Sequence, residues 1–283
     1  MVCLVMYWQT ARFEIDLARP QVMGIVNLTP DSFSDGGAVV SVTTALARCE
    51  QMLKEGADIL DLGAESTRPG ARPVSIDEEL SRLLPVLDAA LTLGCPVSVD
   101  TYKPAVMEQA LARGADIIND INALRSPGAV QLMAAHRSCG VCLMHMRGEP
   151  ESMQSNLLYD GDVVAEVSAF LWERFEVLRS SGVAEHRIVL DPGIGFGKSV
   201  AHNIDLLRRQ REFLKLGRPL LIGWSRKSTL GSITGRDITQ RLAASVAAAL
   251  ASVQGGARIV RVHDVGATVD ALRVWNAAGL GLG

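Results

Sequence analysis

The residues of this chain that could do chemistry are concentrated where short apolar runs end. The clearest case is residues 188–199, IVLDPGIGFGKS, in which three apolar residues lead to Asp191, followed by a proline, three glycines and Lys198. This pattern predicts a buried strand that delivers one carboxylate to its C-terminal tip. The glycines leave the backbone beyond the tip open to close approach by a ligand.

The same arrangement recurs along the chain. Polar side chains follow the other apolar runs, and they are Asn27; Glu65, Thr67 and Arg68; Asp100; Asn119 and Asp120; His145; Ser225, Arg226, Lys227 and Ser228; and Arg261, His263 and Asp264. Helix capping and ordinary loop polarity explain any one of these sites. Capping does not call for Arg, Lys or His directly after a strand, so the eight sites together favour a shared functional mouth.

The charges in this set indicate the kind of ligand. The cations are Arg68, Lys198, Arg226, Lys227, Arg261 and His263, although Arg226 would point away or belong to a loop. Three or more cations around one mouth predict a phosphate or diphosphate site. The acids are Asp100, Asp120 and Asp191, with Asn119 beside them. A buried carboxylate needs donors, either from Lys227 in a structural ion pair or from a ligand with two adjacent N–H groups, such as a guanine or pterin edge.

Asn27 is the predicted metal ligand. Its amide, with Asp31 and Asp35 nearby in the sequence, offers the hard oxygen atoms that suit Mg²⁺ alongside a diphosphate. The other metal motif is weaker, because the C-x-x-C pair Cys139 and Cys142 leads into an apolar run and has no second pair. The residues around Asn27 are thus compatible with Mg²⁺, and we expect the two cysteines to be small buried residues.

The elements that must position these residues alternate strictly. Apolar β-runs cover residues 22–26, 59–62, 97–99, 117–118, 141–144, 188–190, 220–224 and 259–262, and amphipathic helical runs cover 42–56, 76–93, 104–113, 127–138, 161–181, 201–215, 238–254 and 267–278. This order predicts an α/β protein with a closed (β/α)₈ TIM barrel, in a single domain over residues 1–283. An open doubly wound sheet is the alternative, but it expects a G-x-G-x-x-G after the first strand, which is absent. Residues 1–20 predict an N-terminal β-hairpin extension that covers one end of the core.

Composition excludes several classes of protein. The net charge is −3 and no basic tract occurs, which argues against a nucleic-acid partner. No run approaches the roughly 20 apolar residues that span a bilayer, and residues 1–8 lack the regions of a signal peptide. Five scattered cysteines do not form a disulfide framework. We expect a cytosolic protein that binds neither nucleic acid nor membrane.

Eight motifs occur in order over residues 13–275. They are 23–37 (MGIVNLTPDSFSDGG), 65–70 (ESTRPG), 99–104 (VDTYKP), 119–121 (NDI), 143–146 (LMHM), 191–198 (DPGIGFGK), 225–228 (SRKS) and 261–265 (RVHDV). Together they resemble bacterial dihydropteroate synthases, a pterin-binding TIM-barrel family. The departures are Trp224 in place of a smaller residue, Ala64 in place of a frequent glycine, and the residues at 122–124; none is a matched site residue.

The resemblance implies a transferase of folate synthesis that condenses 6-hydroxymethyl-7,8-dihydropterin diphosphate with p-aminobenzoate and releases diphosphate. It also implies Mg²⁺ as cofactor, a homodimer, with residues 242–250 as a plausible contact, and competitive inhibition by sulfonamides. Carried over by motif, Asp100, Asn119, Asp191 and Lys227 hold the pterin and Met144 packs on its ring; Thr67, Arg68, Arg261 and His263 hold the diphosphate; Asn27 binds Mg²⁺; and Phe196, Lys227 and Ser228, with the loop residues Phe33, Thr67 and Pro69, surround p-aminobenzoate.

The implied chemistry is a dissociative substitution at the pterin methylene, with Asp100, Asp191, Lys227, Arg261 and His263 as the catalytic set. Cationic groups stabilise charge on the leaving diphosphate. One rival is a pterin-dependent methyltransferase, which has no diphosphate to bind. The other is a paralogue that binds pterin without turnover.

Overall fold

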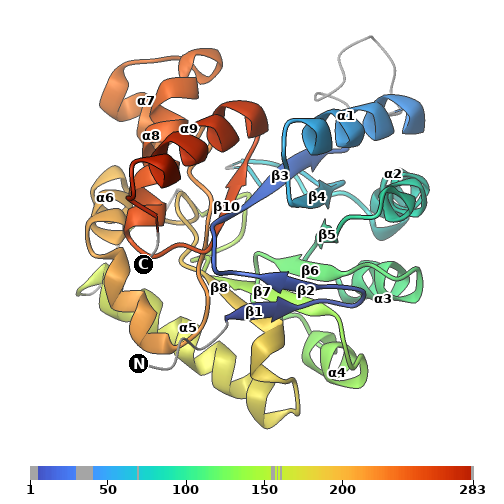
Figure 1. Cartoon of the computed structure of the whole chain (residues 1–283). Coiled ribbons are helices and arrows are strands. Elements are labelled where there is room, and N and C mark those ends of the chain that lie inside the picture. The colour runs from blue at the N-terminus through green and yellow to red at the C-terminus, as the bar shows by residue number, and fades with distance from the viewer. Residues whose placement is uncertain are drawn as a thin grey trace.

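The computed structural model describes residues 6–29, 41–68, 70–153, 157, 159 and 161–281 (Figure 1). Its large sheet contains the strands β3 Gln21–Asn27, β4 Ile59–Gly63, β5 Val97–Asp100, β6 Ile117–Asp120, β7 Gly140–Met144, β8 Ile188–Asp191, β9 Leu221–Ile222 and β10 Ile259–Val262. The α-helices are α1 Val42–Lys54, α2 Ile76–Ala90, α3 Pro104–Ala112, α4 Ala129–Ala135, α5 Val163–Ser180, α6 Val200–Arg208, α7 Ser228–Thr234, α8 Leu242–Gln254 and α9 Val265–Ala277. Short 3₁₀ turns follow α2 (Leu91–Leu93) and α6 (Gln210–Leu216) and precede β8 (Glu185–Arg187) and α8 (Ile238–Gln240).

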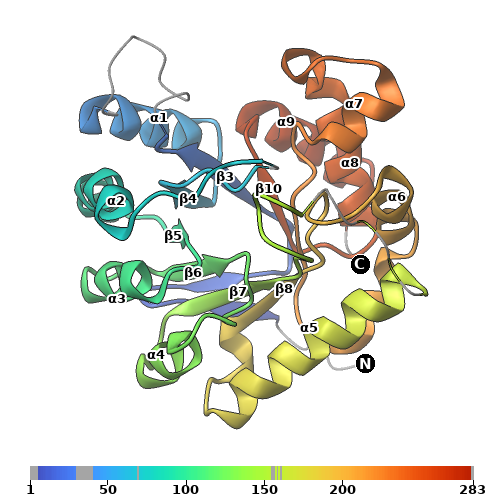
Figure 2. The ribbon, with the colours of Figure 1, turned by 180° about the vertical axis from the view of Figure 1, so that it is seen from behind.

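The sheet closes into a barrel. Its strand order is β8-β7-β6-β5-β4-β3-β10-β9, and every neighbouring pair is parallel. The remaining gap is bridged by a parallel pairing of Leu190 with Leu220, where the Leu190 N–H donates to the Pro219 carbonyl over 3.0 Å. The helices surround the strands in both views (Figures 1 and 2). The predicted TIM barrel is confirmed, and the open-sheet alternative is wrong.

The barrel interior changes from apolar to polar along the strands. Side chains that alternate along a strand point to opposite faces, so residues two apart share the inner face. Near the strand starts the interior is apolar, with Met23, Ile59, Ile117, Val189 and Ile259 packed together. Two residues farther along four of these strands stand Asp61, Asn119, Asp191 and Arg261. The polar layer therefore rests directly on an apolar one.

A two-stranded hairpin closes the apolar end, as predicted from residues 1–20. Strands β1 Tyr7–Gln9 and β2 Glu14–Asp16 pair antiparallel, and Trp8, Ile15 and Leu17 pack against the apolar interior layer. The Trp8 indole donates to the Arg187 carbonyl over 2.8 Å. The hairpin lies in front in Figure 1 and on the far side in Figure 2.

The predicted helices match the structure in position, but the runs predicted over 76–93 and 201–215 each consist of an α-helix followed by a 3₁₀ turn, and larger differences occur near residues 228–240. Helix α7 was not predicted, because its sequence STLGSIT lacks an apolar stripe. The run predicted as one helix over 238–254 consists of a 3₁₀ turn followed by α8. Strand β9 is also shorter than the predicted 220–224. Across the described ranges no helix is both long and apolar enough to cross a membrane.

Replacing Trp8 with alanine tests the role of the hairpin. Trp8 is fully buried, so Trp8→Ala should lower the free energy of unfolding by about 3–5 kcal/mol. The matched control is Trp172→Ala, because Trp172 is 47% exposed and its loss should cost no more than about 0.5 kcal/mol. Urea unfolding followed by far-UV circular dichroism measures both. Equal effects of the two substitutions would show that the hairpin does not support the barrel.

Candidate active site

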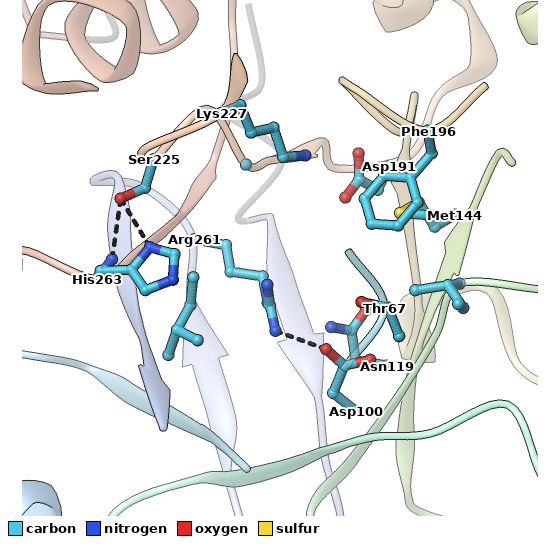
Figure 3. A pocket seen from close by; sticks show the side chains of 13 residues that line it. Thr67, Asp100, Asn119, Met144, Asp191, Phe196, Ser225, Lys227, Arg261 and His263 are labelled. Carbon is cyan, nitrogen blue, oxygen red and sulfur yellow. Dashed lines mark hydrogen bonds and ion pairs between the residues drawn. The ribbon is translucent and has the colours of Figure 1, made fainter. Parts of the chain in front are cut away.

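A cavity at the C-terminal ends of the strands gathers most of the predicted site residues (Figure 3). It is lined by Thr67, Asp100, Asn119, Met144, Asp191, Phe196, Lys227, Arg261 and His263, together with Ile25, Ile121, Gly223 and Ser225. Polar and apolar side chains alternate around it, as in sites that orient a small molecule. Residues from all eight barrel strands or the loops that follow them therefore meet at one place.

The centre of this cavity is a buried ionic cluster around Arg261. The Arg261 Nε donates to Asp61 Oδ2 and the Arg261 Nη2 to Asp100 Oδ2, each over 2.6 Å. Asn119 Nδ2 donates to the same oxygen of Asp61 over 3.3 Å. Two of the five guanidinium N–H groups are thus used, which leaves three of them for a ligand.

Asp61 is a site residue that the sequence reasoning missed. It is fully buried in β4 and orients both Arg261 and Asn119. The signal was present, because a carboxylate in the middle of the apolar run ILDLG requires a buried partner. Our sequence reasoning concerned the strand ends and did not consider this interior position.

Asp100 has a carboxylate oxygen available to a ligand. Its Oδ1 is buried and has no hydrogen-bond partner among the described residues. Burial raises the pKa of Asp100 to about 7, against the lowering effect of Arg261. A buried oxygen without a donor is rarely left so in a native structure. The arrangement fits a ligand that brings its own N–H groups.

Asp191 lies at the tip of β8, as its sequence predicts. Its Oδ1 accepts the Gly193 N–H over 2.7 Å, and burial raises its pKa while the charge of Lys227 opposes that rise. Gly193 has a φ of +69°, and a Cβ there would lie 1.9 Å from the His145 carbonyl oxygen. Only glycine therefore permits this turn.

Lys227 faces Asp191 across the cavity without forming an ion pair with it in the described structure (Figure 3). Its ammonium donates to the Ile194 carbonyl and lies 4.8 Å from the centroid of the Phe196 ring. Burial lowers the pKa of Lys227 to about 8, while the charge of Asp191 opposes that shift. The alternative of a purely structural Asp191–Lys227 ion pair is therefore not supported.

The wall beside these charges is apolar. Ile121, Met144, Met146 and Met153 form a small cluster, with Phe196 packed against it. Methionine adapts to aromatic surfaces and makes favourable sulfur contacts with rings. This wall suits a planar ligand whose polar edge reaches Asp100 and Asp191.

His263 and Ser225 line the cavity beside Arg261 and contact each other. Ser225 Oγ accepts the His263 backbone N–H over 3.1 Å and lies 3.0 Å from His263 Nδ1. Burial, then the charges of Arg261 and Arg226, lower the pKa of His263 to about 3, and Arg68 adds to that effect. Arg68 is itself exposed and, like Ser228 at the start of α7, does not line the cavity.

Lys198 was predicted to contribute to the anion site, and this is wrong. Its ammonium is buried and lies 2.8 Å from His145 Nδ1, and it donates to the carbonyls of Gly193 over 2.9 Å and Phe196 over 3.1 Å. Burial lowers the pKa of Lys198, and burial also lowers the pKa of His145, to about 2. Lys198 therefore fixes the loop that carries Phe196 rather than meeting a ligand.

Two other charged residues lie outside the cavity. Arg226, with a φ of +59°, turns outward and pairs with Asp264, with an Nε to Oδ2 distance of 3.0 Å. Asp120, grouped with the ligand-binding acids by sequence, instead accepts the backbone N–H groups of Asn122 and Leu124, each over 2.7 Å. Ala123 and Leu124 both have a positive φ, which is unfavourable for residues other than glycine. The two bonds to Asp120 stabilise the turn that contains them.

The metal prediction concerns Asn27, the last residue of β3. Asp31, Asp35, Phe33 and Pro69 lie outside the described residues. Within the described ranges no group of three or more His, Cys, Asp or Glu could hold a metal ion. Mg²⁺ commonly keeps several waters and needs few protein ligands beside a bound phosphate, so a single amide oxygen fits it. Cys139 and Cys142 are buried free thiols at β7, as expected.

Comparisons with known proteins agree with this geometry. The profile of a family described as pterin binding enzyme matches residues 23–263. The dihydropteroate synthase of Neisseria meningitidis serogroup B is 56% identical over 281 residues, which cover 97% of this chain and 98% of the relative.

Solved structures of the same kind superpose closely. That of Xanthomonas albilineans dihydropteroate synthase with 4-aminobenzoic acid has a TM-score of 0.91 and 49% identity, and covers 97% of this chain and 98% of that one. That of the Yersinia pestis enzyme with a sulfonamide drug complex has a TM-score of 0.91 and 44% identity, and covers 97% and 100%. The chain therefore belongs to the pterin-binding enzymes and, among them, to the dihydropteroate synthases.

Proposed function

We propose that the cavity binds the pterin ring of the substrate at the acids Asp100 and Asp191. The diphosphate group of the same substrate then lies beside Arg261 and His263. The reaction is the condensation of 6-hydroxymethyl-7,8-dihydropterin diphosphate with p-aminobenzoate to give 7,8-dihydropteroate and diphosphate. The observation that carries the proposal is the convergence of Asp100, Asn119 and Asp191 with Lys227 and Arg261 on one enclosed space.

The pterin edge is assigned to the acids. The unpartnered Oδ1 of Asp100 and the carboxylate of Asp191 accept N–H groups of the ring, and Asn119 and Lys227 complete the polar contacts. Met144 packs on the ring face. With Asp61, three carboxylates surround two cations, Arg261 and Lys227, so full ionisation leaves one net negative charge. That charge favours a substrate that becomes cationic.

The reaction step is a dissociative substitution. The bond between the methylene carbon and the diphosphate oxygen breaks, and its electron pair leaves with diphosphate. Arg261, His263, Thr67 and Arg68 stabilise the growing negative charge by donating hydrogen bonds or by charge. The amine nitrogen of p-aminobenzoate then attacks the cationic methylene and releases a proton to water. Phe196, Lys227 and Ser228 surround the incoming aromatic acid, and sulfonamides compete for the same place, as the Yersinia pestis complex suggests.

Mg²⁺ is assigned to Asn27 together with the diphosphate oxygens. When bound, the ion would neutralise charge on the leaving group. We also propose that the protein is cytosolic and homodimeric, with a contact near residues 242–250. Leu242 is 46% exposed and Val274 on the neighbouring α9 is 70% exposed, which supports an apolar contact surface there.

Removing Lys227 or Asp191 tests the cavity assignment. Lys227→Ala and Asp191→Ala should each lower turnover by about a hundredfold or more, because each removes preorganised charge from the reacting groups. The exposed matched controls are Lys215→Ala and Asp270→Ala, which should keep normal turnover. A coupled assay of diphosphate release measures the rates, and circular dichroism checks the fold. Near-normal turnover in either cavity variant would refute its role.

The pH dependence of kcat/KM should be bell-shaped with a maximum between about 7 and about 8. Asp100 must be ionised, so activity falls as pH drops through about 7, and Lys227 must be protonated, so activity falls as pH rises through about 8. Lys227→Arg should move the alkaline limb upward, because arginine does not deprotonate there. An alkaline limb that stays in place in this variant would belong to another group.

Chelation tests the metal assignment. Turnover should be lost in excess EDTA and restored by Mg²⁺, and Asn27→Ala should raise the Mg²⁺ concentration needed for half-maximal rate. The control is Asn276→Ala, an exposed amide on α9, which should leave that concentration unchanged. If chelation had no effect on turnover, the Mg²⁺ assignment would fail.

A further inference from the structure

The contact between Ser225 and His263 is the feature of the cavity with no role in the scheme above. Ser225 follows β9 and His263 follows β10, so the contact joins two adjacent loops (Figure 3). The Ser225 hydroxyl is buried and has two partners, the His263 backbone N–H and the ring nitrogen Nδ1. A second pairing, Arg226 with Asp264, holds the same loops together one residue farther on.

The hydrogen atoms of this contact can be assigned by counting donors. A hydroxyl has one hydrogen to donate and two lone pairs to accept with. One lone pair of Ser225 accepts the His263 backbone N–H, so the hydroxyl hydrogen can go to Nδ1. If Nδ1 carried the proton instead, the hydroxyl hydrogen would need another acceptor, and the described residues provide none. Leaving it buried and unpaired would cost about 1–3 kcal/mol.

The imidazole ring of His263 carries no charge near pH 7. Burial lowers the pKa of His263 to about 3, and the charges of Arg261, Arg226 and Arg68 add to this effect while Asp264 opposes it. A further cation, Arg48, donates to the His263 carbonyl over 3.1 Å. The ring is therefore neutral near pH 7. A neutral imidazole that accepts at Nδ1 carries its proton at Nε2. In Figure 3 the ring nitrogen not bonded to Ser225 lies on the side that faces the cavity.

We infer that Ser225 is a positioning residue that fixes the tautomer of His263, so that a neutral ring presents its Nε2–H to the leaving diphosphate. The inference rests on the diphosphate role proposed for His263. The opposite tautomer would turn a lone pair toward a growing anion and would repel it. A neutral donor also releases diphosphate more readily than a further fixed positive charge does, because the attraction between a dipole and an anion is weaker.

The test reads the tautomer directly by NMR of the full-length protein labelled with ¹⁵N-histidine, without substrate, near pH 7. The chain has five histidines, and the His263 signals are those missing from His263→Gln. We expect Nδ1 to be of the unprotonated, pyridine type and Nε2 of the protonated, pyrrole type. A protonated Nδ1 in the wild-type protein, with or without a protonated Nε2, overturns the inference. This readout does not depend on activity, so it remains decisive even if the wild-type protein proved to have no synthase activity.

The kinetic arm uses Ser225→Ala and the conservative variant Ser225→Thr. Ser225→Ala should lose the tautomer preference and lower kcat by about 10- to 100-fold, as when a partner of an orienting histidine is removed. KM for p-aminobenzoate should stay unchanged, whereas a collapse of the site would raise it. Ser225→Thr keeps the hydroxyl and should retain most of the wild-type tautomer preference and most of the wild-type kcat.

The matched control is Ser252→Ala, a buried serine on α8 whose hydroxyl donates to the Ala248 carbonyl over 2.7 Å, away from the cavity. It should keep the wild-type spectrum and kcat. Ser225→Ala with unchanged tautomer and unchanged kcat overturns the inference. If Ser225→Ala does not fold, the wild-type spectrum decides alone.

Discussion

The site depends on one partly exposed arginine, Arg261, that lies between the carboxylates of Asp61 and Asp100. Arg261 is bonded to Asp61 and Asp100, and each of the three groups would be costly to bury without the others. Removing one partner of such a cluster typically costs about 3–5 kcal/mol, because a charge is left without a counter-charge. The cluster sets the direction of Asp100 and Asn119, and therefore the position of the ligand edge. The stability of the polar layer and its chemical function cannot be separated.

The cluster around Arg261 lacks hydrogen-bond donors that a ligand can supply. Asp61 and Asp100 each retain a buried oxygen with no partner in the described structure, and Asp100 has a pKa near neutrality. A protein that filled these positions internally would be more stable but would have no affinity for an N–H-rich edge. The apolar layer and hairpin beneath supply the burial that offsets this deficit.

The barrel could be predicted from sequence because its signals are local and repeated. Each strand is a short apolar run, and most helices have their own stripe. The errors therefore concern α7, which has no stripe, and the exact lengths of β9 and of the helices that adjoin 3₁₀ turns. The polar residues at the strand ends then identified Asp191, Arg261 and His263, which all line the cavity.

The hydrogen-bond partners of the charged side chains could not be predicted in the same way. Lys198 and Asp120 bond to backbone groups of loops whose course depends on tertiary packing. Asp61 stands out in the sequence as a carboxylate within an apolar run, but its partner Arg261 lies 200 residues away and is known only from the fold.

The hairpin at the apolar end of the barrel has a consequence for how ligands enter and leave the cavity. Trp8, Ile15 and Leu17 pack against the apolar layer at one end, and within the described residues the cavity lies at the opposite end of the strands. A molecule held among the loops there would obstruct the entry and the exit of a ligand bound deeper in the cavity. An excess of the aromatic acid before the pterin binds, or slow release of the product, would therefore lower turnover although no contact within the protein changes.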